Sequence, residues 1–376
     1  MFSTDPDIYG DGVNLVASAA KLEALVTVRI EALARAIQPP FTAPRRRAIR
    51  TALAEAQAEA TRLGRLCSRW IVEMGMNLQD QPRVLRLIQL LQLWNDAAER
   101  LEATIMAPPR PLTPDAPRPG SLDEAVAEST DRFFERLHMA FSPDTPVYHV
   151  GEGPFHGDIP LPMTRFQNLI RAAARLLRAM DRPEPWSFLE VGCGLGLKLL
   201  AAQEQFAHVT GIEYDPVRAD AAQAMMDRAH LHLTEADNAP SPWLRGTAPQ
   251  SRAVVHSGDA LDFAEYGSFD VIYAYRPIAD PDLRTRLEQR IIADARPGSL
   301  LIMPYPDFGA YGGAEGSVQL DRFLHLKPGP RIKPEALLRR AGHVGLTRPT
   351  EPTGGRPDEG FVAPLTAALR HWGHLA

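Results

Sequence analysis

The stretch that decides the fold is Glu190–Gly196, EVGCGLG, which ends the short apolar run SFLEV. Glycine stands at every second position from Gly192 to Gly196, so the backbone can turn sharply and a ligand can approach without meeting a Cβ atom. Leu197 takes the place of the last glycine in the dinucleotide pattern G-x-G-x-x-G. The stretch therefore predicts a strand-to-helix turn at a ligand site, but not a dinucleotide fingerprint.

Strand and helix patterns alternate on both sides of this turn. Alternation at this spacing favours an α/β fold with a doubly wound, mostly parallel sheet. We expect strands at 187–192, 208–213, 253–259, 269–275 and 299–305, and helices at 197–205, 217–229 and 280–295. Late strands are expected at Val318–Leu326 and His343–Leu346, flanking a helix at Pro334–Ala341.

The rest of the chain predicts a second domain. Apolar residues recur at helical spacing through three segments of residues 1–106, which predicts a helical N-terminal domain. Residues 107–120 are rich in proline and read as a stiff linker. Residues 121–348 then form the sheet domain, and 349–376 form a C-terminal tail with one docking helix.

Three carboxylates are expected at the tips of neighbouring strands. Glu190 would attract a ligand ammonium group, while the start of the following helix can hold a carboxylate. Glu213 is placed to accept from two ribose hydroxyls, and Asp259 from an adenine amine. Together these groups describe S-adenosylmethionine. The plainer alternatives are an arginine partner for Glu190, a solvated turn for Glu213 and an ordinary Gly-Asp turn for Asp259.

The sequence resembles the class I S-adenosylmethionine-dependent methyltransferases. The matching pieces are LEVGCGLG, GIEYDP, SGDAL, FDVIYAY and ARPGSLLI, in the family's order, over roughly residues 162–304. The resemblance implies that Glu190 and Gly192 contact the methionine moiety, with Gly194 and Gly196 in the turn. It also implies that Glu213 contacts the ribose, and that Asp259 and Ala260 contact adenine. Thr164, beside Arg165, would contact the methionine carboxylate. A plain helix cap is the alternative for Thr164.

The acceptor side departs from the family. Many members that methylate nitrogen carry Asn/Asp-Pro-Pro-aromatic after the fourth strand, where this chain has Tyr-Arg-Pro-Ile from Tyr275. DNA-base and glutamine methylation are therefore not expected. Tyr275 is a candidate to lie near the sulfonium, or simply packs the sheet. Arg276 suits an anionic substrate, or forms a structural ion pair.

The loop before the sheet, Tyr148–Pro162, gathers histidine, acid and glycine. His156 or His149 is a candidate general base for the acceptor. His149, His156 and Asp158 match no firm metal-binding spacing, so no metal is expected. The stretch Tyr305–Gly313 is a candidate wall of the substrate pocket or a surface loop.

The amino-acid composition limits the kinds of binding partner that we expect. A net charge of −5 gives no general attraction to nucleic acid or anionic lipid. Two cysteines, no basic-then-apolar leader and no long apolar run predict a soluble, cytoplasmic protein. We expect the basic cluster Arg45–Arg47 with Arg50 to be a solvated face of a helix. The helices of residues 1–106 are expected to form a dimerisation surface or a cover over the active site.

These patterns predict an enzyme that moves a methyl group from S-adenosylmethionine to a nitrogen or oxygen atom, with a small-molecule acceptor favoured over a protein side chain. The alternative is a catalytically silent scaffold or partner subunit that binds the same ligand. An NAD-dependent oxidoreductase is opposed by the incomplete glycine pattern and by Glu190.

Overall fold

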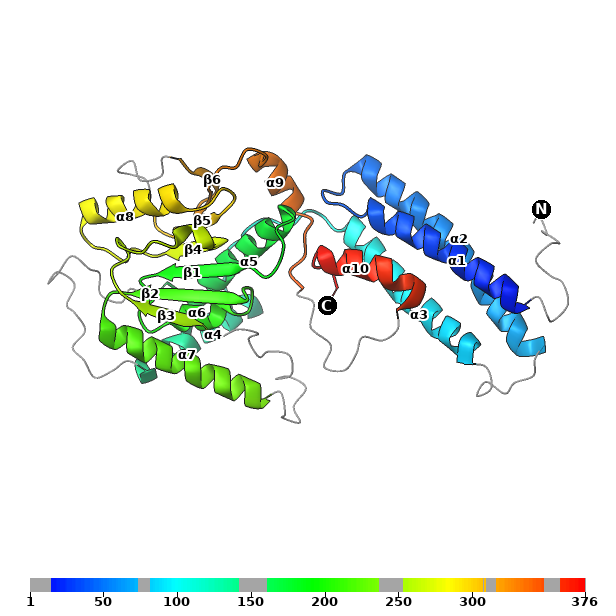
Figure 1. Ribbon diagram of the computed structural model, residues 1–376, viewed down its shortest axis with the longest axis horizontal. Helices are drawn as coiled ribbons and strands as arrows, with labels where there is room; N and C mark the ends of the chain where they lie inside the picture. The colour runs from blue at the N-terminus through cyan, green and yellow to red at the C-terminus, as the bar shows by residue number, and fades with distance from the viewer. Residues whose placement is uncertain are drawn as a thin grey trace. The chain divides into compact units, whose positions relative to one another are not determined.

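The computed structural model describes residues 15–73, 82–141, 161–236, 253–306, 308, 316–347 and 359–375. Its contacts divide the chain into two compact units (Figure 1). The helical unit comprises Met1–Arg110 and His343–Ala376, and the sheet unit comprises Pro111–Gly342.

The helical unit is held together by apolar stripes. Side chains three or four positions apart, such as Val26, Ile30 and Leu33, are fully buried and line one face of a helix. Trp94 is also fully buried, and its indole nitrogen donates to Gln57 Oε1 over 2.8 Å. The described helices are α1 (Leu15–Ala36), α2 (Ala43–Glu73), α3 (Pro82–Met106) and α10 (Ala363–His371). The predicted helical N-terminal region is confirmed.

The C-terminal helix α10 completes the helical unit. It packs against α1 and α3 through the buried side chains Leu365 and Leu369. Trp372, just after the helix, donates its indole N–H to the carbonyl oxygen of Ile37 over 2.8 Å. The C-terminal segment, for which we expected one docking helix, thus packs with the N-terminal helices.

The strand predicted at His343–Leu346 is wrong, because no strand forms there. The backbone N–H of Gly345 donates to the carbonyl oxygen of Trp372 over 2.9 Å, and that of Thr347 donates to Gly373 over 3.0 Å. These backbone groups are therefore satisfied by the end of α10 and not by a sheet neighbour.

The sheet unit is built on a mixed sheet of order β3-β2-β1-β4-β5-β7-β6. The first five strands run parallel, and β7 is antiparallel to both of its neighbours. Their bounds are β1 (Ser187–Val191), β2 (His208–Glu213), β3 (Val254–Ser257), β4 (Val271–Ala274), β5 (Leu300–Ile302), β6 (Val318–Asp321) and β7 (Leu324–Leu326). The doubly wound, mostly parallel sheet predicted from the sequence is confirmed.

The single strand expected at Val318–Leu326 is in fact a hairpin of β6 and β7. The turn comes at Asp321–Arg322, where an Asp321 carboxylate oxygen accepts the N–H of Arg322 over 2.7 Å. An aspartate that bonds the backbone beside it favours a turn over a continuing strand.

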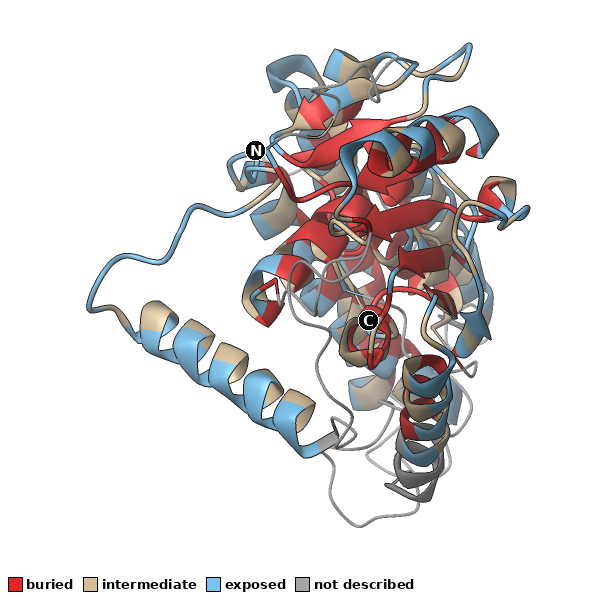
Figure 2. Cartoon of the chain, turned by 90° about the vertical axis from the view of Figure 1, so that its left-hand side faces the viewer, coloured by how far each residue is buried: buried red, intermediate tan, exposed pale blue. Residues whose placement is uncertain are grey.

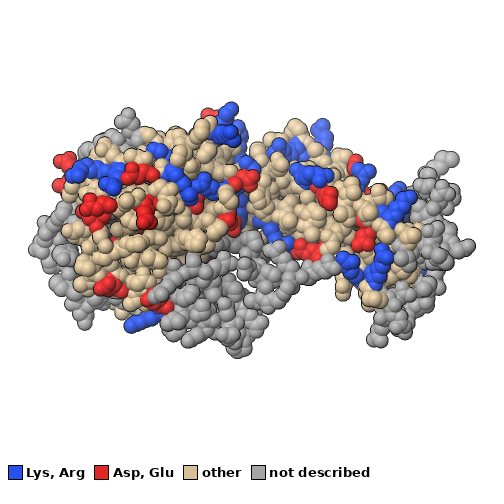
Figure 3. All heavy atoms as spheres, viewed as in Figure 1, with Lys and Arg blue, Asp and Glu red and all other residues tan. Residues whose placement is uncertain are grey.

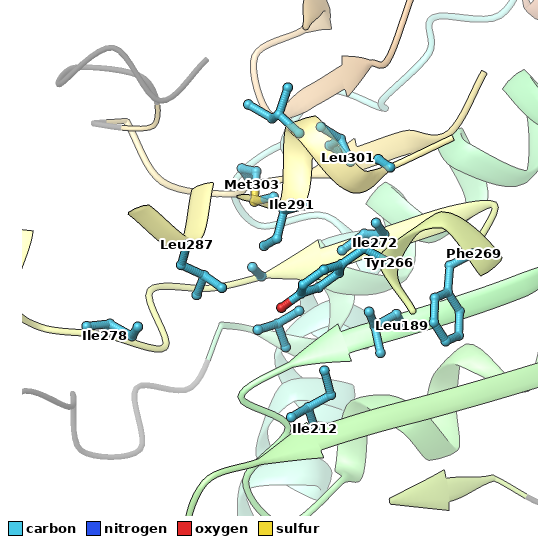
Figure 4. Packing of buried hydrophobic residues seen from close by; sticks show 14 of the residues in the cluster. Leu189, Ile212, Tyr266, Phe269, Ile272, Ile278, Leu287, Ile291, Leu301 and Met303 are labelled. Atoms are coloured by element: carbon cyan, nitrogen blue, oxygen red, sulfur yellow. The ribbon is translucent and has the colours of Figure 1, made fainter. Parts of the chain in front are cut away.

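Helices cover both faces of this sheet. On one face, Phe166 of α5 packs edge-on against Tyr273 of β4, and α6 contacts β1 and β2. On the other face, Leu287 and Ile291 of α8 pack in a cluster with alternate residues of the strands, as Figure 4 shows. The bounds are α5 (Met163–Ala179), α6 (Leu197–Ala202), α7 (Pro216–Ala236), α8 (Pro281–Asp294) and α9 (Pro334–Ala341).

Helix α4 (Leu122–Phe141) lies at the margin of the sheet unit. None of its described residues is buried, whereas the central strands of the sheet are buried (Figure 2). The proline-rich segment before α4 is anchored on the sheet unit. Arg175 of α5 donates to the carbonyl oxygen of Pro111 over 2.6 Å, and Thr113 donates to Asp321 Oδ2 over 2.6 Å.

Basic and acidic side chains alternate over the described surface seen in Figure 3, and neither sign forms one large field on that face. Among the helices of the described ranges, none combines the length and apolar character that crossing a bilayer requires.

Candidate active site

The strand order reverses at β1, which lies between β2 and β4. In open parallel sheets, ligands bind at the carboxyl edge of such a reversal. The glycine turn follows β1, Glu213 ends β2, Asp259 follows β3 and Tyr275 follows β4. The topology therefore brings these predicted residues to the same edge of the sheet.

The glycine turn after β1 uses backbone conformations that favour glycine. Gly192, Gly194 and Gly196 have φ angles of 74°, 55° and 75°. A Cβ atom on Gly192 would lie 2.7 Å from Cβ of Pro277, in the turn after β4. The N–H groups of Gly192 and Cys193 both donate to the carbonyl oxygen of Ile212, over 2.8 and 3.0 Å. The turn is thus fixed against both neighbouring strands.

Glu213 reaches from the end of β2 to this turn. One carboxylate oxygen accepts the N–H of Gly194 over 2.8 Å, and the other accepts that of Asp215 over 3.1 Å. Burial raises the pKa of Glu213 above its ordinary value, while the hydrogen bonds from Asp215 and Gly194 act in the opposite direction. Glu213 is therefore a structural part of the site, and its contact with a ribose stays a prediction.

Glu190 lies in β1 and is only 2% exposed. Its register partners are Gly211 on β2 and Tyr273 on β4. Its charge adds to burial in raising the pKa of the Cys193 thiol well above the ordinary value. Cys193 is therefore a buried thiol that keeps its proton.

Tyr273 was not among the predicted site residues. Its ring packs against Phe166 and Phe188 on the α5 face of the sheet. Its hydroxyl is buried and has no hydrogen-bond partner in the described part of the chain. Burial, followed by the charge of Glu190, raises the pKa of this hydroxyl well above its ordinary value. No sequence pattern distinguishes this tyrosine from a core residue.

The turn after β3 is ordered by its own side chains. Asp259 Oδ1 accepts the N–H of Leu261 over 2.8 Å, and the carbonyl oxygen of Ala260 accepts the Tyr266 hydroxyl over 2.7 Å. Gly258 donates its N–H to the carbonyl oxygen of Glu213 over 2.9 Å, which ties the turn to β2. Asp259 therefore forms the ordinary turn considered above, and adenine binding by Asp259 and Ala260 stays a prediction.

Thr164 lies in the first turn of α5. Its N–H and its hydroxyl each donate to Asp131 of α4, both over 2.8 Å. Thr164 is therefore not the helix cap that we considered as the alternative: the N-cap position is Pro162, and the Asp131 carboxylate accepts both bonds. A contact of Thr164 with the cofactor stays a prediction. Asp131 was missed, because nothing in α4 marks it as the partner of a residue 33 positions later.

The turn after β4 holds the two acceptor-side candidates. Tyr275 is partly buried against the cluster shared by β4, β5 and α8. Arg276 has a φ of 46°, a backbone conformation that residues other than glycine adopt only at a cost in free energy. Its guanidinium carbon lies 5.7 Å from the centre of the Tyr305 ring.

Behind this turn lies a buried polar group that the sequence did not indicate. The Tyr305 hydroxyl donates to Glu288 Oε1 over 2.9 Å, and both residues are buried. Arg284 Nε lies 3.8 Å from the same carboxylate oxygen. The ring beneath Arg276 is thus fixed by a hydrogen bond to α8.

Several predicted residues lie outside the described residues. These are His149, His156 and Asp158 in the loop before α5, and most of Tyr305–Gly313. Within the described ranges, no group of three or more histidine, cysteine, aspartate or glutamate residues is arranged to hold a metal ion.

The described residues fit S-adenosylmethionine. A buried carboxylate, Glu190, stands where an ammonium group would need one, beside a buried tyrosine hydroxyl. The crowding at Gly192 shows that this turn accepts no larger residue.

A comparison with protein families agrees with this reading. Residues 189–279 match the model of a methyltransferase domain. The matched segment runs from β1 to the turn after β4 and contains the glycine turn, Glu213 and Asp259. The sheet unit is therefore a class I S-adenosylmethionine-dependent methyltransferase domain. The family, the enzyme class and the cofactor expected from the sequence are confirmed.

Solved structures resemble part of the chain at low identity. An RNA methyltransferase from Salinibacter ruber in complex with S-adenosyl-L-homocysteine is 16% identical, with a TM-score of 0.28 over 46% of this chain and 97% of its own. The sugar N-methyltransferase KedS8 from Streptoalloteichus is 20% identical, with a TM-score of 0.27 over 43% of this chain and 57% of its own. Magnesium protoporphyrin IX methyltransferase from Synechocystis is 13% identical, with a TM-score of 0.26 over 48% and 70%. No curated protein matches the chain.

Proposed function

We propose that the chain transfers the methyl group of S-adenosylmethionine to a nitrogen or oxygen atom of a small-molecule acceptor. One observation carries the proposal: Glu190 and Glu213 stand on either side of a glycine turn at the reversal point of the sheet. A buried carboxylate and a carboxylate already bonded to the turn suit a ligand with an ammonium group at one end and a ribose at the other.

The protein residues bind and orient. Glu190 would accept hydrogen bonds from the ammonium group, and Glu213 would accept hydrogen bonds from the ribose hydroxyls. Asp259 and Ala260 would contact adenine. When bound, the cofactor supplies a methyl group on a positively charged sulfur. Binding at the β1 turn orients that methyl group, and exclusion of water protects it from hydrolysis.

The acceptor would lie beyond β4. Arg276 and Tyr275 are the described side chains that would face it, and Arg276 is held against a fixed tyrosine ring. Such fixed side chains suit a small acceptor better than a flexible peptide, because less freedom is lost when the acceptor is oriented. His156 would remove the acceptor proton.

Titration calorimetry of the full chain with S-adenosylmethionine, S-adenosylhomocysteine and NAD tests the cofactor site. We expect the first two to bind and NAD not to bind. Glu213→Ala should weaken binding by about 10- to 100-fold, because it removes charge-assisted hydrogen bonds. Glu265→Ala, at an exposed carboxylate between β3 and β4, is the matched control and should leave binding unchanged. Equal affinity of both variants would contradict the assignment.

A screen of small-molecule amines, alcohols and acids for S-adenosylhomocysteine release tests transfer. His156→Gln should lower kcat by about 10²- to 10⁴-fold without weakening cofactor binding. Cofactor binding with no turnover on any acceptor would favour the scaffold alternative.

A further inference from the structure

Two arginine side chains lie against one aromatic ring in the sheet unit. The guanidinium carbon of Arg165, in the first turn of α5, lies 4.5 Å from the centre of the Phe323 ring. That of Arg322 lies 5.0 Å from the same centre. We call Arg165 and Arg322 the arginine pair. The pair joins residues that are far apart in the sequence.

The arginine pair lies at the carboxyl edge of the sheet. Because β7 runs antiparallel to β5, the turn before β7 lies at the edge where β5 ends. The N–H of Met303, just after β5, donates to the carbonyl oxygen of Phe323 over 3.0 Å, which fixes the turn there. Phe166, the residue after Arg165, packs its ring against Tyr273, the register partner of Glu190, with 5.0 Å between the ring centres. The pair is therefore close to the methyltransferase site.

The charges of the pair are open to a ligand. Both arginines are exposed, whereas Phe323 is only 8% exposed. Among the residues that the structure describes, no carboxylate forms an ion pair with either arginine. Asp321 is adjacent in sequence, but its oxygens accept from the N–H of Arg322 and the hydroxyl of Thr113.

Two positive charges held on one ring repel each other. The ring attracts each guanidinium by a cation–π interaction, which offsets the repulsion without neutralising either charge. An anion that contacts both groups would neutralise them. Guanidinium groups present paired donors that match the oxygens of phosphate or carboxylate.

We propose that the arginine pair binds a phosphoryl group of the acceptor. A phosphate monoester carries a charge of about −1.5 to −2 at neutral pH, which matches two guanidiniums, whereas one carboxylate matches one. The inference rests on the proposed function, since it assigns the substrate class of the same site. The acceptor is then a phosphorylated small molecule, and Arg276, in the turn after β4, would contact the part that carries the nucleophile.

Inorganic phosphate is the probe, followed by phosphorus NMR titration of the full chain with and without S-adenosylhomocysteine. We expect saturable phosphate binding that Arg165→Gln and Arg322→Gln each weaken about tenfold. Arg286→Gln is the matched control, because Arg286 is an exposed arginine on α8 and its substitution removes the same charge. This variant should bind phosphate like the unmodified chain. Acetate should bind more weakly than phosphate.

Four results would overturn the inference. The first is the absence of saturable phosphate binding, and the second is an equal loss of phosphate affinity in Arg286→Gln. The third is acetate binding as tight as phosphate binding. The fourth is an Arg165→Gln variant that loses S-adenosylhomocysteine binding but keeps phosphate binding. The last result would assign Arg165 to the carboxylate of the cofactor.

The two proposals fail separately. Absence of S-adenosylhomocysteine binding would remove the proposed function, while phosphate binding to the arginine pair is still measured. Thermal unfolding of each variant keeps folding apart from binding, because substitutions of exposed arginines should change Tm by no more than about 2 °C.

Discussion

The two halves of the carboxyl edge are built differently. At β1–β3, the cofactor half, backbone groups fix the turns: Gly194 donates to Glu213, and Gly258 donates to the Glu213 carbonyl oxygen. At β4–β7, where we propose that the acceptor binds and which we call the acceptor half, side chains do so: Arg276 lies against Tyr305, and the Tyr305 hydroxyl donates to Glu288. Backbone geometry constrains the cofactor half to few sequences, whereas side chains at the acceptor half can change without altering the sheet.

The largest effect is expected at the cofactor half. Gly192→Ala adds a Cβ atom 2.7 Å from Pro277 at a residue with φ of 74°. Strain and crowding together should lower the free energy of unfolding by about 3 kcal/mol. Gly258→Ala is the matched control, because a Cβ atom there has no neighbour within 4 Å. Urea unfolding compares the two, and equal losses would mean that the turn is not rigid.

The second effect comes from His325 in the acceptor half. Burial lowers its pKa from 6.5 to about 4. Between these two pH values the unfolded chain therefore binds a proton at this histidine, whereas the folded chain does not. Stability should therefore fall by roughly 2–3 kcal/mol as the pH drops from 6.5 through 4. His325→Leu should reduce this acid loss, as urea unfolding across that pH range would detect. His208→Leu, at an exposed histidine on β2, should not; equal acid loss in both variants would contradict the prediction.

The third prediction compares two buried tyrosines. Tyr305→Phe removes a hydroxyl bonded to buried Glu288 and should cost about 1–3 kcal/mol. Tyr273→Phe removes a hydroxyl with no hydrogen-bond partner in the described ranges, so stability should be unchanged or slightly higher. Chemical denaturation measures both. A large loss in Tyr273→Phe would show that its hydroxyl is bonded in solution.

The smallest effect returns to the cofactor half. Because burial raises the pKa of Glu213 above 4.5, the folded chain holds the proton to a higher pH than the unfolded chain. Stability should therefore fall as the pH rises from 4.5 through the folded pKa, the reverse of the His325 slope. Glu213→Gln should remove this slope while keeping one hydrogen bond to the turn. An unchanged slope in that variant would place its origin elsewhere.

The sequence predicted the parallel strands of both halves, but it did not predict the contacts between segments that are distant in the chain. The glycine turn and the strands from Ser187 to Ile302 follow from residues close together in the chain. The contacts of Arg165 with Phe323 and of Thr164 with Asp131 join distant segments, which local patterns do not encode. The β6–β7 hairpin was missed because its turn contains no glycine or proline.

The bond from Trp372 to Ile37 has a consequence for synthesis. Because α10 packs on α1 and α3, the helical unit is discontinuous in sequence and the sheet unit is inserted into it. During translation, α1–α3 emerge first but lack their last helix until the whole inserted unit has left the ribosome. The methyltransferase domain can therefore fold on the nascent chain before the helical unit is completed.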